Sequence, residues 1–326
     1  MNRFLEFKSK FKILAGLSIL VFCVSFVGVR SASLPAAATD ATIYTTNQTF
    51  GAGEDVGITN NGIAWLLGGF TMPNSGIVTF KTPVPVGDSI LLDTTGIATL
   101  ASDMHLADGA RIGASGNIDA HRFSLVLTGS FSLGGSTVTF VNNNASIVGD
   151  GNVLDFDGGV LAISNNLTLT LSNIVLRNFT TGSITWGNAS SQLYLENVLI
   201  ELSGNFSVAG ILNTYGTNVV TGVGQDLILA AGSIVTVESG SILSFDHGTT
   251  LDINVDSFHN NGILHFNGCT VDIAGAGLNL NDAGTLLFEN RVVITGGETL
   301  ENSAGTTKVL SGATVELKSG ATLNIG

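Results

Sequence analysis

An eight-residue phrase recurs along this chain and restricts what it can fold into. Each copy starts with glycine, continues with a small residue, and carries Val, Leu, Ile or Phe at the third and fifth positions after the glycine. Because side chains alternate between the two sides of a strand, positions one, three and five point the same way. Each copy therefore predicts a half-buried strand of about five residues that ends at a glycine-containing turn. The copies begin at Gly135, Gly232, Gly240, Gly248, Gly312 and Gly320.

A longer period is three times this phrase. Residues 168–178 match residues 192–202 at an offset of 24. Repeats of this length are typical of solenoids, and short strands within them indicate a β-helix. We expect an all-β chain wound as a single-stranded parallel β-helix (a β-solenoid), with about 24 residues per coil and three sides to each coil. The matched pairs are Leu169 with Leu193, Leu171 with Leu195, Asn173 with Asn197, and Ile174 with Val198.

Stacked coils place like residues above one another, so Asn173 and Asn197 are expected to form a structural ladder at one corner. The competing folds are tandem β-sandwiches and a β-propeller, which also use short alternating strands. Those folds need hairpin turns, whereas the turns here are mostly Ser-Gly or Ala-Gly. The hydrophobic fraction of 44% excludes a disordered chain, and the 42 glycines lack the three-residue period of collagen.

The N-terminus has the three parts of a secretory signal. A basic segment at 1–12 precedes an apolar run at 13–29, and small residues follow it. We expect a signal peptide at 1–33, cleaved after Ser33 or near Ala38; the alternative is an uncleaved membrane anchor. The rest of the chain has 7 basic and 24 acidic residues, a net charge of −17. This charge predicts no nucleic-acid partner and, after cleavage, no insertion into a membrane. The protein is expected to be secreted or at the cell surface, either associated with an outer membrane or extracellular.

Two further segments follow the signal. Residues 34–74 are less regular and are predicted to form an N-terminal cap, and residues 75–326 are predicted to form the β-helix. The chain stops inside the copy that begins at Gly320. We therefore expect a β-helix that is incomplete at its C-terminus, with the apolar floor of the last coil exposed and available for end-to-end self-association.

The phrases SIVGDGNVLDF (146–156) and LTLTLSNIVLRNF (167–179) resemble coils of secreted right-handed parallel β-helix proteins. That group has a pectin-lyase-like fold and includes autotransporter passengers, filamentous adhesins and polysaccharide lyases. The resemblance covers about residues 75–326. It implies a right-handed coil, and either a structural or adhesive role or activity on polysaccharides.

Candidate chemistry is sparse. The densest acidic cluster, Asp150, Asp155 and Asp157, is a candidate for contact with calcium or a glycan, although Asp and Gly also simply build turns. The spacings of 12 and 6 between His247, His259 and His265 fit no common zinc motif, which favours ordinary surface histidines. Cys269 is predicted to be a small buried residue.

No catalytic constellation, cofactor site or metal site is identified in the sequence. The main hypothesis is a non-enzymatic rod with a structural or adhesive role, which binds a glycan or a host- or cell-surface ligand through repetitive polar faces. The alternative is a polysaccharide-active β-helix enzyme, a lyase or glycoside hydrolase, with its site at the aspartate cluster.

Overall fold

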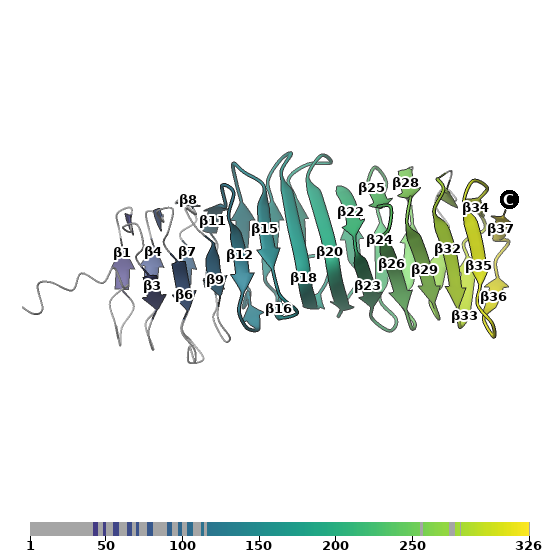
Figure 1. Ribbon diagram of the computed structural model, residues 1–326, viewed down its shortest axis with the longest axis horizontal. Coiled ribbons are helices and arrows are strands. Elements are labelled where there is room, and N and C mark those ends of the chain that lie inside the picture. Colours follow the sequence, from purple (N-terminus) through teal and green to yellow (C-terminus); the bar gives the residue numbers. More distant parts are fainter. Residues whose placement is uncertain are drawn as a thin grey trace, which may run out of the picture.

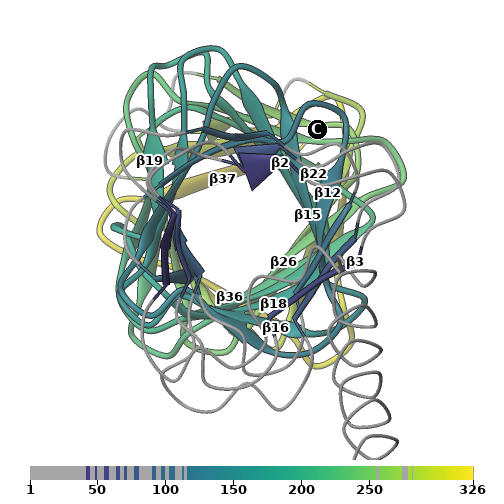
Figure 2. The same cartoon turned by 90° about the vertical axis from the view of Figure 1, so that its left-hand side faces the viewer.

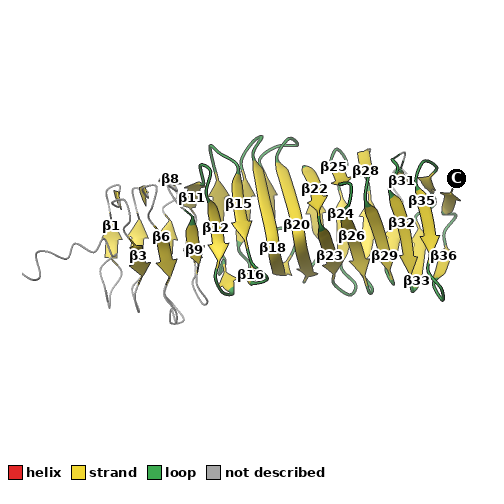
Figure 3. Cartoon of the chain, viewed as in Figure 1, coloured by secondary structure: helices red, strands yellow, loops and turns green. Residues whose placement is uncertain are grey.

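The computed structural model is a parallel β-solenoid (Figure 1). It describes residues 116–254, 257–273, 278–280 and 282–325, residues 103–106, and short strands between residues 42 and 113. Every pairing between described strands is parallel, and the described residues contain no helix (Figure 3). From residue 116 onward the chain makes about nine turns of about 23 residues. The all-β class and the stacked coil are thus as the repeat predicts.

Each turn has three faces around one core, as the view along the rod shows (Figure 2). The first face contains β12 (Ser124–Leu127), β15 (Ala145–Val148), the first halves of β18 (Thr168–Phe179) and β20 (Gln192–Leu202), β22 (Ile211–Tyr215), β25 (Ile234–Val237) and β28 (Ser257–Asn260), followed in chain order by the separate sheet of β31 (Leu278–Asn279), β34 (Thr299–Asn302) and β37 (Thr322–Ile325). The second face contains β13 (Phe131–Ser132), β16 (Val153–Asp155), the second halves of β18 and β20, β23 (Thr217–Thr221), β26 (Ile242–Asp246), β29 (Ile263–Asn267), β32 (Thr285–Glu289) and β35 (Thr306–Val309).

The third face is built from two sheets. The first holds β11 (Gly116–Asp119), β14 (Thr137–Phe140), β17 (Val160–Ile163) and β19 (Ile184–Trp186). The second holds β21 (Phe206–Val208), β24 (Asp226–Leu229), β27 (Thr250–Ile253), β30 (Thr270–Asp272), β33 (Arg291–Thr295) and β36 (Thr314–Leu317). The hydrogen-bond ladder of this face is therefore interrupted between β19 and β21.

The described N-terminal strands pair in the same parallel way, for example Thr42 with Ala64 and Ala64 with Ile90. They are β1 (Thr42–Tyr44), β2 (Gln48–Thr49), β3 (Asp55–Ile58), β4 (Ala64–Leu66), β5 (Phe70–Thr71), β6 (Ile77–Phe80), β7 (Ile90–Leu92), β8 (Ile97–Thr99), β9 (Met104–Leu106) and β10 (Ile112–Gly113). The predicted signal peptide at 1–33, and the predicted cap at 34–74 apart from β1 to β5, lie outside the described residues. No helix of the described residues is long and apolar enough to cross a membrane.

The glycine phrase forms its strands as expected. In the copy that begins at Gly232, the inward positions Ser233, Val235 and Val237 are buried, and β25 spans the second to fifth positions. Gly232 itself has φ +82°, a left-handed conformation that is strained for residues with a Cβ. The turn therefore requires glycine at this position, which is why the phrase can be read from the sequence.

The spacing of the coils is less regular than 24. From residue 116 onward the register step is 24 from Leu169 to Leu193, but it ranges from 19 between β20 and β22 to 25 between β23 and β26. The variation lies at the corners. Between β15 and β16 the segment 149–152 opposes only two residues of the next turn, because the offset to β18 falls from 24 on β15 to 22 on β16.

Aromatic side chains stack inside the rod. Phe245, Phe266 and Phe288 are register partners, all fully buried, with ring centroids 6.1 and 5.5 Å apart. A second column, Phe156, Phe179 and Phe206, has centroid separations of 4.9 and 4.5 Å. Each ring excludes water from the next, so burial is shared between neighbouring turns.

The last described turn is more exposed than the turns before it. Val309, Leu317 and Ile325 are 53%, 48% and 52% exposed, whereas Phe288 and Ile294, one turn earlier, are fully buried. The apolar side chains of β35, β36 and β37 are therefore less covered than those of the turn before them.

Candidate binding groove on the third face

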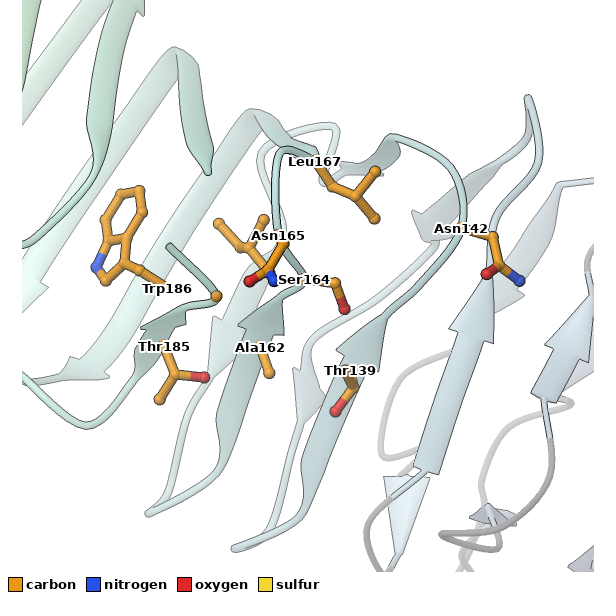
Figure 4. A pocket seen from close by; sticks show the side chains of 10 residues that line it. Thr139, Asn142, Ala162, Ser164, Asn165, Leu167, Thr185 and Trp186 are labelled. Atoms are coloured by element: carbon orange, nitrogen blue, oxygen red, sulfur yellow. The ribbon is translucent and has the colours of Figure 1, made fainter. Parts of the chain in front are cut away.

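A groove of about 520 Å³ lies on the outside of the third face. Its floor is a column of outward residues on three neighbouring strands, Thr139, Ala162 and Thr185, which are register partners. Asn142 and Trp186 lie at its two ends (Figure 4). Its remaining lining is Ile163, Ser164, Asn165, Leu167 and Gly187. The groove thus crosses three turns and runs along the rod.

The wall of the groove is an amide-rich ridge, defined here as the corner segments 141–144, 164–167 and 187–191 between the third and first faces. Asn188 Nδ2 donates to Asn166 Oδ1 at 3.0 Å, and Asn188 Oδ1 accepts from the Asn166 backbone N–H at 3.2 Å. The Thr168 N–H donates to Asn144 Oδ1 at 2.9 Å. These bonds join one turn of the ridge to the next, as amide ladders do.

Asp119, at the end of β11 in the preceding turn, binds the first segment of the ridge. Its carboxylate accepts from Asn143 Nδ2 at 2.8 Å, from Asn142 Nδ2 at 3.1 Å and from the His121 N–H at 3.0 Å. Burial alone would raise the pKa of this carboxyl, but the hydrogen bonds from Asn143, Asn142 and His121 outweigh it and lower the pKa. Asp119 is therefore held as a carboxylate by the residues that it positions.

The ridge ends at a step. The corner after β21 has no counterpart of residues 187–191, because only 19 residues separate the register partners of β20 and β22. Gly210 occupies this shorter corner, and a Cβ there would collide with the Trp186 ring. Trp186 Nε1 is buried without a hydrogen-bond partner.

The residues that line the groove are uncharged. Its polar groups are the hydroxyls of Thr139, Ser164 and Thr185 and the amides of Asn142 and Asn165, and none of its ten lining residues is ionisable. Hydroxyls and amides both donate and accept hydrogen bonds. The groove therefore suits a neutral ligand rich in hydroxyl groups. Sequence reasoning did not identify this groove, because it depends on how three corners lie side by side.

The predicted aspartate cluster is divided between two corners. Asp150 lies exposed at the corner between β15 and β16, with φ +49°. Asp155 lies at the end of β16, and its Oδ1 accepts from the Asp157 N–H at 3.1 Å and from Asn178 Nδ2 at 2.7 Å. Asp157 is exposed in the following turn with φ +41°. Among the residues that the structure describes, no three His, Cys, Asp or Glu side chains are grouped so as to hold a metal ion.

Asn173 and Asn197 lie at the same corner of successive turns. Asn197 Nδ2 donates to Asn173 Oδ1 at 3.2 Å. Both residues have positive φ, +50° and +54°, which asparagine tolerates better than most residues. In the next turn Gly216 occupies this corner and the Thr217 N–H donates to Asn197 Oδ1 at 2.9 Å. The sequence pattern located this pair through its exact offset of 24.

The histidines have specific partners that their sequence spacing does not reveal. His265 alternates with buried Leu264 and Phe266, as expected for an outward residue, and bonds Ser244 at 3.1 Å and Glu289 at 3.1 Å. His259 bonds Ser257 at 2.9 Å and Asp282 at 3.3 Å. His247 is exposed in a turn. The partners of both bonded histidines include residues one turn away, which explains why spacing within a motif missed them.

Cys269 is 2% exposed and packs in the core. Burial raises the pKa of its thiol to about 12. A thiol that remains protonated at neutral pH is a poor nucleophile, so Cys269 fills space in the core.

Comparisons of the chain with protein-family models, with curated proteins and with solved structures find no match.

Proposed function

We propose that this protein is a secreted or cell-surface rod with a structural or adhesive role, which binds a neutral glycan through the groove on its third face. A relation to the pectin-lyase-like proteins and autotransporter passengers that residues 146–179 resemble is part of this proposal. The observation that carries it is the groove itself, whose hydroxyls and amides cross three stacked turns without a charged group. Its rigidity favours binding, because a preformed site loses little conformational freedom.

The charge of the chain narrows the class of ligand. After the predicted signal, the chain has 24 acidic and 7 basic residues, and such a surface repels polyanions. A neutral polysaccharide avoids this repulsion. A chain lying along the rod would meet similar polar groups on successive turns, so weak contacts would add up.

A glycan array probed with the purified protein tests the proposal. Thr185→Arg places a long side chain in the floor of the groove and is expected to reduce binding at least tenfold. The matched control is Thr295→Arg, which lies in an outward strand position of the same face, more than four turns away from the groove. Equal binding by both variants, or no binding to any neutral glycan, would show that the groove is not the site.

The enzymatic alternative needs a different readout. If the protein cleaves polysaccharide at the aspartate cluster, sugar is released and the release is lost in Asp155→Ala. Because Asp155 also accepts hydrogen bonds from Asp157 and Asn178, the variant must first be shown to keep its thermal midpoint. Binding without product supports the adhesive role.

End-to-end association is a separate part of the proposal. The exposed apolar residues of the last turn, including Leu317 and Ile325, form a surface that a second molecule can cover. We expect the 326-residue chain to associate as its concentration rises, and Leu317→Lys to reduce the association. Val223→Lys is the control, because Val223 is 80% exposed on a corner of the rod. Sedimentation velocity that gives the same monomer at all concentrations would refute the association.

A further inference from the structure

The geometry points to a second function, ester hydrolysis, at a site formed by Ser257, His259 and Asp282. Ser257 and His259 lie two residues apart on β28 and face outward, separated by the buried Phe258. Asp282 comes from the next turn. Ser257 Oγ lies 2.9 Å from His259 Nε2, and His259 Nδ1 lies 3.3 Å from Asp282 Oδ2. The three groups thus form one continuous chain of hydrogen bonds.

The partners of the ring fix the role of each nitrogen. A carboxylate only accepts hydrogen bonds, so His259 Nδ1 carries the hydrogen that is donated to Asp282. In the neutral ring, Nε2 then has a free lone pair directed at the Ser257 hydroxyl. This is the order of nucleophile, general base and orienting acid found in acyl-transfer enzymes of unrelated folds. The Asn260 N–H also donates to Asp282 Oδ2 at 3.1 Å and fixes the carboxylate in place.

A second network, formed by Ser244, His265 and Glu289, shows that such a site also requires an accessible serine. Ser244 Oγ lies 3.1 Å from His265 Nδ1, and Glu289 lies 3.1 Å from His265 Nε2. Ser244 is only 5% exposed, however, and its hydroxyl donates to Asp246 at 2.8 Å. That hydroxyl cannot meet a substrate. By contrast, the His259 side chain is 50% exposed and Ser257 is half-buried, so substrate and water can reach both.

The surroundings of Ser257 indicate the class of substrate. Its register partner on β25 is Ile234, which is 38% exposed, and Ile234 pairs in turn with Ile211 on β22. Two outward isoleucines therefore lead away from the nucleophile along the first face. Apolar surface of this kind favours a short, uncharged acyl group. The substrate class is a small carboxylic ester.

The reaction balances with water as the only co-reactant. Ser257 Oγ attacks the ester carbonyl carbon while its proton moves to His259 Nε2. The bond between the carbonyl carbon and the alcohol oxygen then breaks, and the alcohol leaves with the proton from Nε2. Water next attacks the acyl-serine, giving its proton to Nε2. The carboxylic acid departs, and Ser257 regains its proton. Asp282 acts as a positioning residue throughout, since its carboxylate bonds His259 and the Asn260 N–H among the residues that the structure describes.

The test uses the full chain and p-nitrophenyl acetate and butyrate as substrates. Wild type is expected to exceed the rate of an equal concentration of imidazole. Ser257→Ala and His259→Gln are expected to fall to that background, a loss of about 100-fold or more. Ser146→Ala is the control, because Ser146 is an outward serine on the same face, several turns away. A wild-type rate equal to that of imidazole, or full activity in Ser257→Ala, would overturn the proposal.

Covalent labelling separates catalysis from a structural role of the same residues. A fluorophosphonate probe is expected to label Ser257, as mapped by peptide mass spectrometry, and to leave the buried Ser244 unlabelled. Asp282→Asn is expected to slow the labelling of Ser257 at least tenfold without lowering the thermal midpoint, and Asp282→Glu to restore part of it. Labelling of other serines only, or an Asp282→Asn effect that follows the loss of folding, would contradict the assignment.

Discussion

Asn197 donates a side-chain hydrogen bond to Asn173 across 3.2 Å, and the two residues hold the same corner of consecutive turns in the same left-handed conformation. The pair combines two requirements at one position. The backbone must turn with positive φ, which favours glycine and asparagine. The side chain must also bridge the spacing between turns, which glycine cannot do. Asparagine meets both requirements.

The first prediction separates these two contributions. Asn197→Ala loses the hydrogen bonds to Asn173 and to the Thr217 N–H, and it also loses the tolerance of positive φ. It should lower the free energy of unfolding by about 2–3 kcal/mol. Asn197→Gly loses only the bonds and should cost about 1 kcal/mol. Chemical denaturation measures both, with Glu196→Ala as an exposed neighbouring control. Equal costs for Ala and Gly would show that backbone conformation does not matter at this corner.

The second prediction concerns the stacked phenylalanines. Phe266 lies between Phe245 and Phe288 and is fully buried, so Phe266→Ala should lower the free energy of unfolding by about 3–5 kcal/mol. Thr250→Ala, at an outward position of β27, should change it by less than about 0.5 kcal/mol. Hydrogen exchange should show the largest loss of protection in the two turns that contact Phe266. A loss spread evenly over the rod would argue against stability that depends on neighbouring turns.

The third prediction is a pH dependence at Asp119. The folded state lowers the pKa of this carboxyl, so its stabilising effect is complete above the ordinary value of 3.8 and is lost as the pH falls through the lower folded value. Asp119→Asn should cost about 1.5–3 kcal/mol at pH 7, because bonds to a charged acceptor are lost. The difference between variant and wild type should shrink below pH 3.8. A difference that does not change with pH would exclude a charged role for Asp119.

The fourth prediction is that the carboxylate of Asp252, unlike that of Asp119, destabilises the folded state at neutral pH. Burial, and then the charge of its register partner Asp272, raise the pKa of Asp252. Its carboxylate therefore opposes folding at neutral pH, and the penalty is relieved as the pH falls through the raised folded value. Asp252→Asn should raise the thermal midpoint at pH 7 and keep the bond from Asn254. The gain should vanish in acid. Asp157→Asn, at an exposed turn, is the control and should change little.

The sequence determined the local structure and the stacking of similar residues. The glycine phrase requires a positive-φ turn before each alternating strand, so strand positions and inward residues followed directly, as in Val235 and Val237. The offset of 24 placed Leu169 on Leu193, and it continues to Ile174 and Val198 because the corner at Asn173 and Asn197 has the same length in both turns. These features are local or strictly periodic, and both kinds of information survive in a single sequence.

Apart from the Asn173–Asn197 pair, only the tertiary structure decided which polar side chains meet. Asp282 reaches His259, and Asn188 reaches Asn166, in the part of the rod after residue 116, where the register steps vary between 19 and 25 residues. The lengths of individual corners set those steps, and an average period cannot supply them. A shift of one residue would turn a side chain to the opposite side of its strand. The groove, the ridge and the Ser257–His259–Asp282 site therefore follow from how the turns are stacked, whereas the turns themselves follow from the sequence.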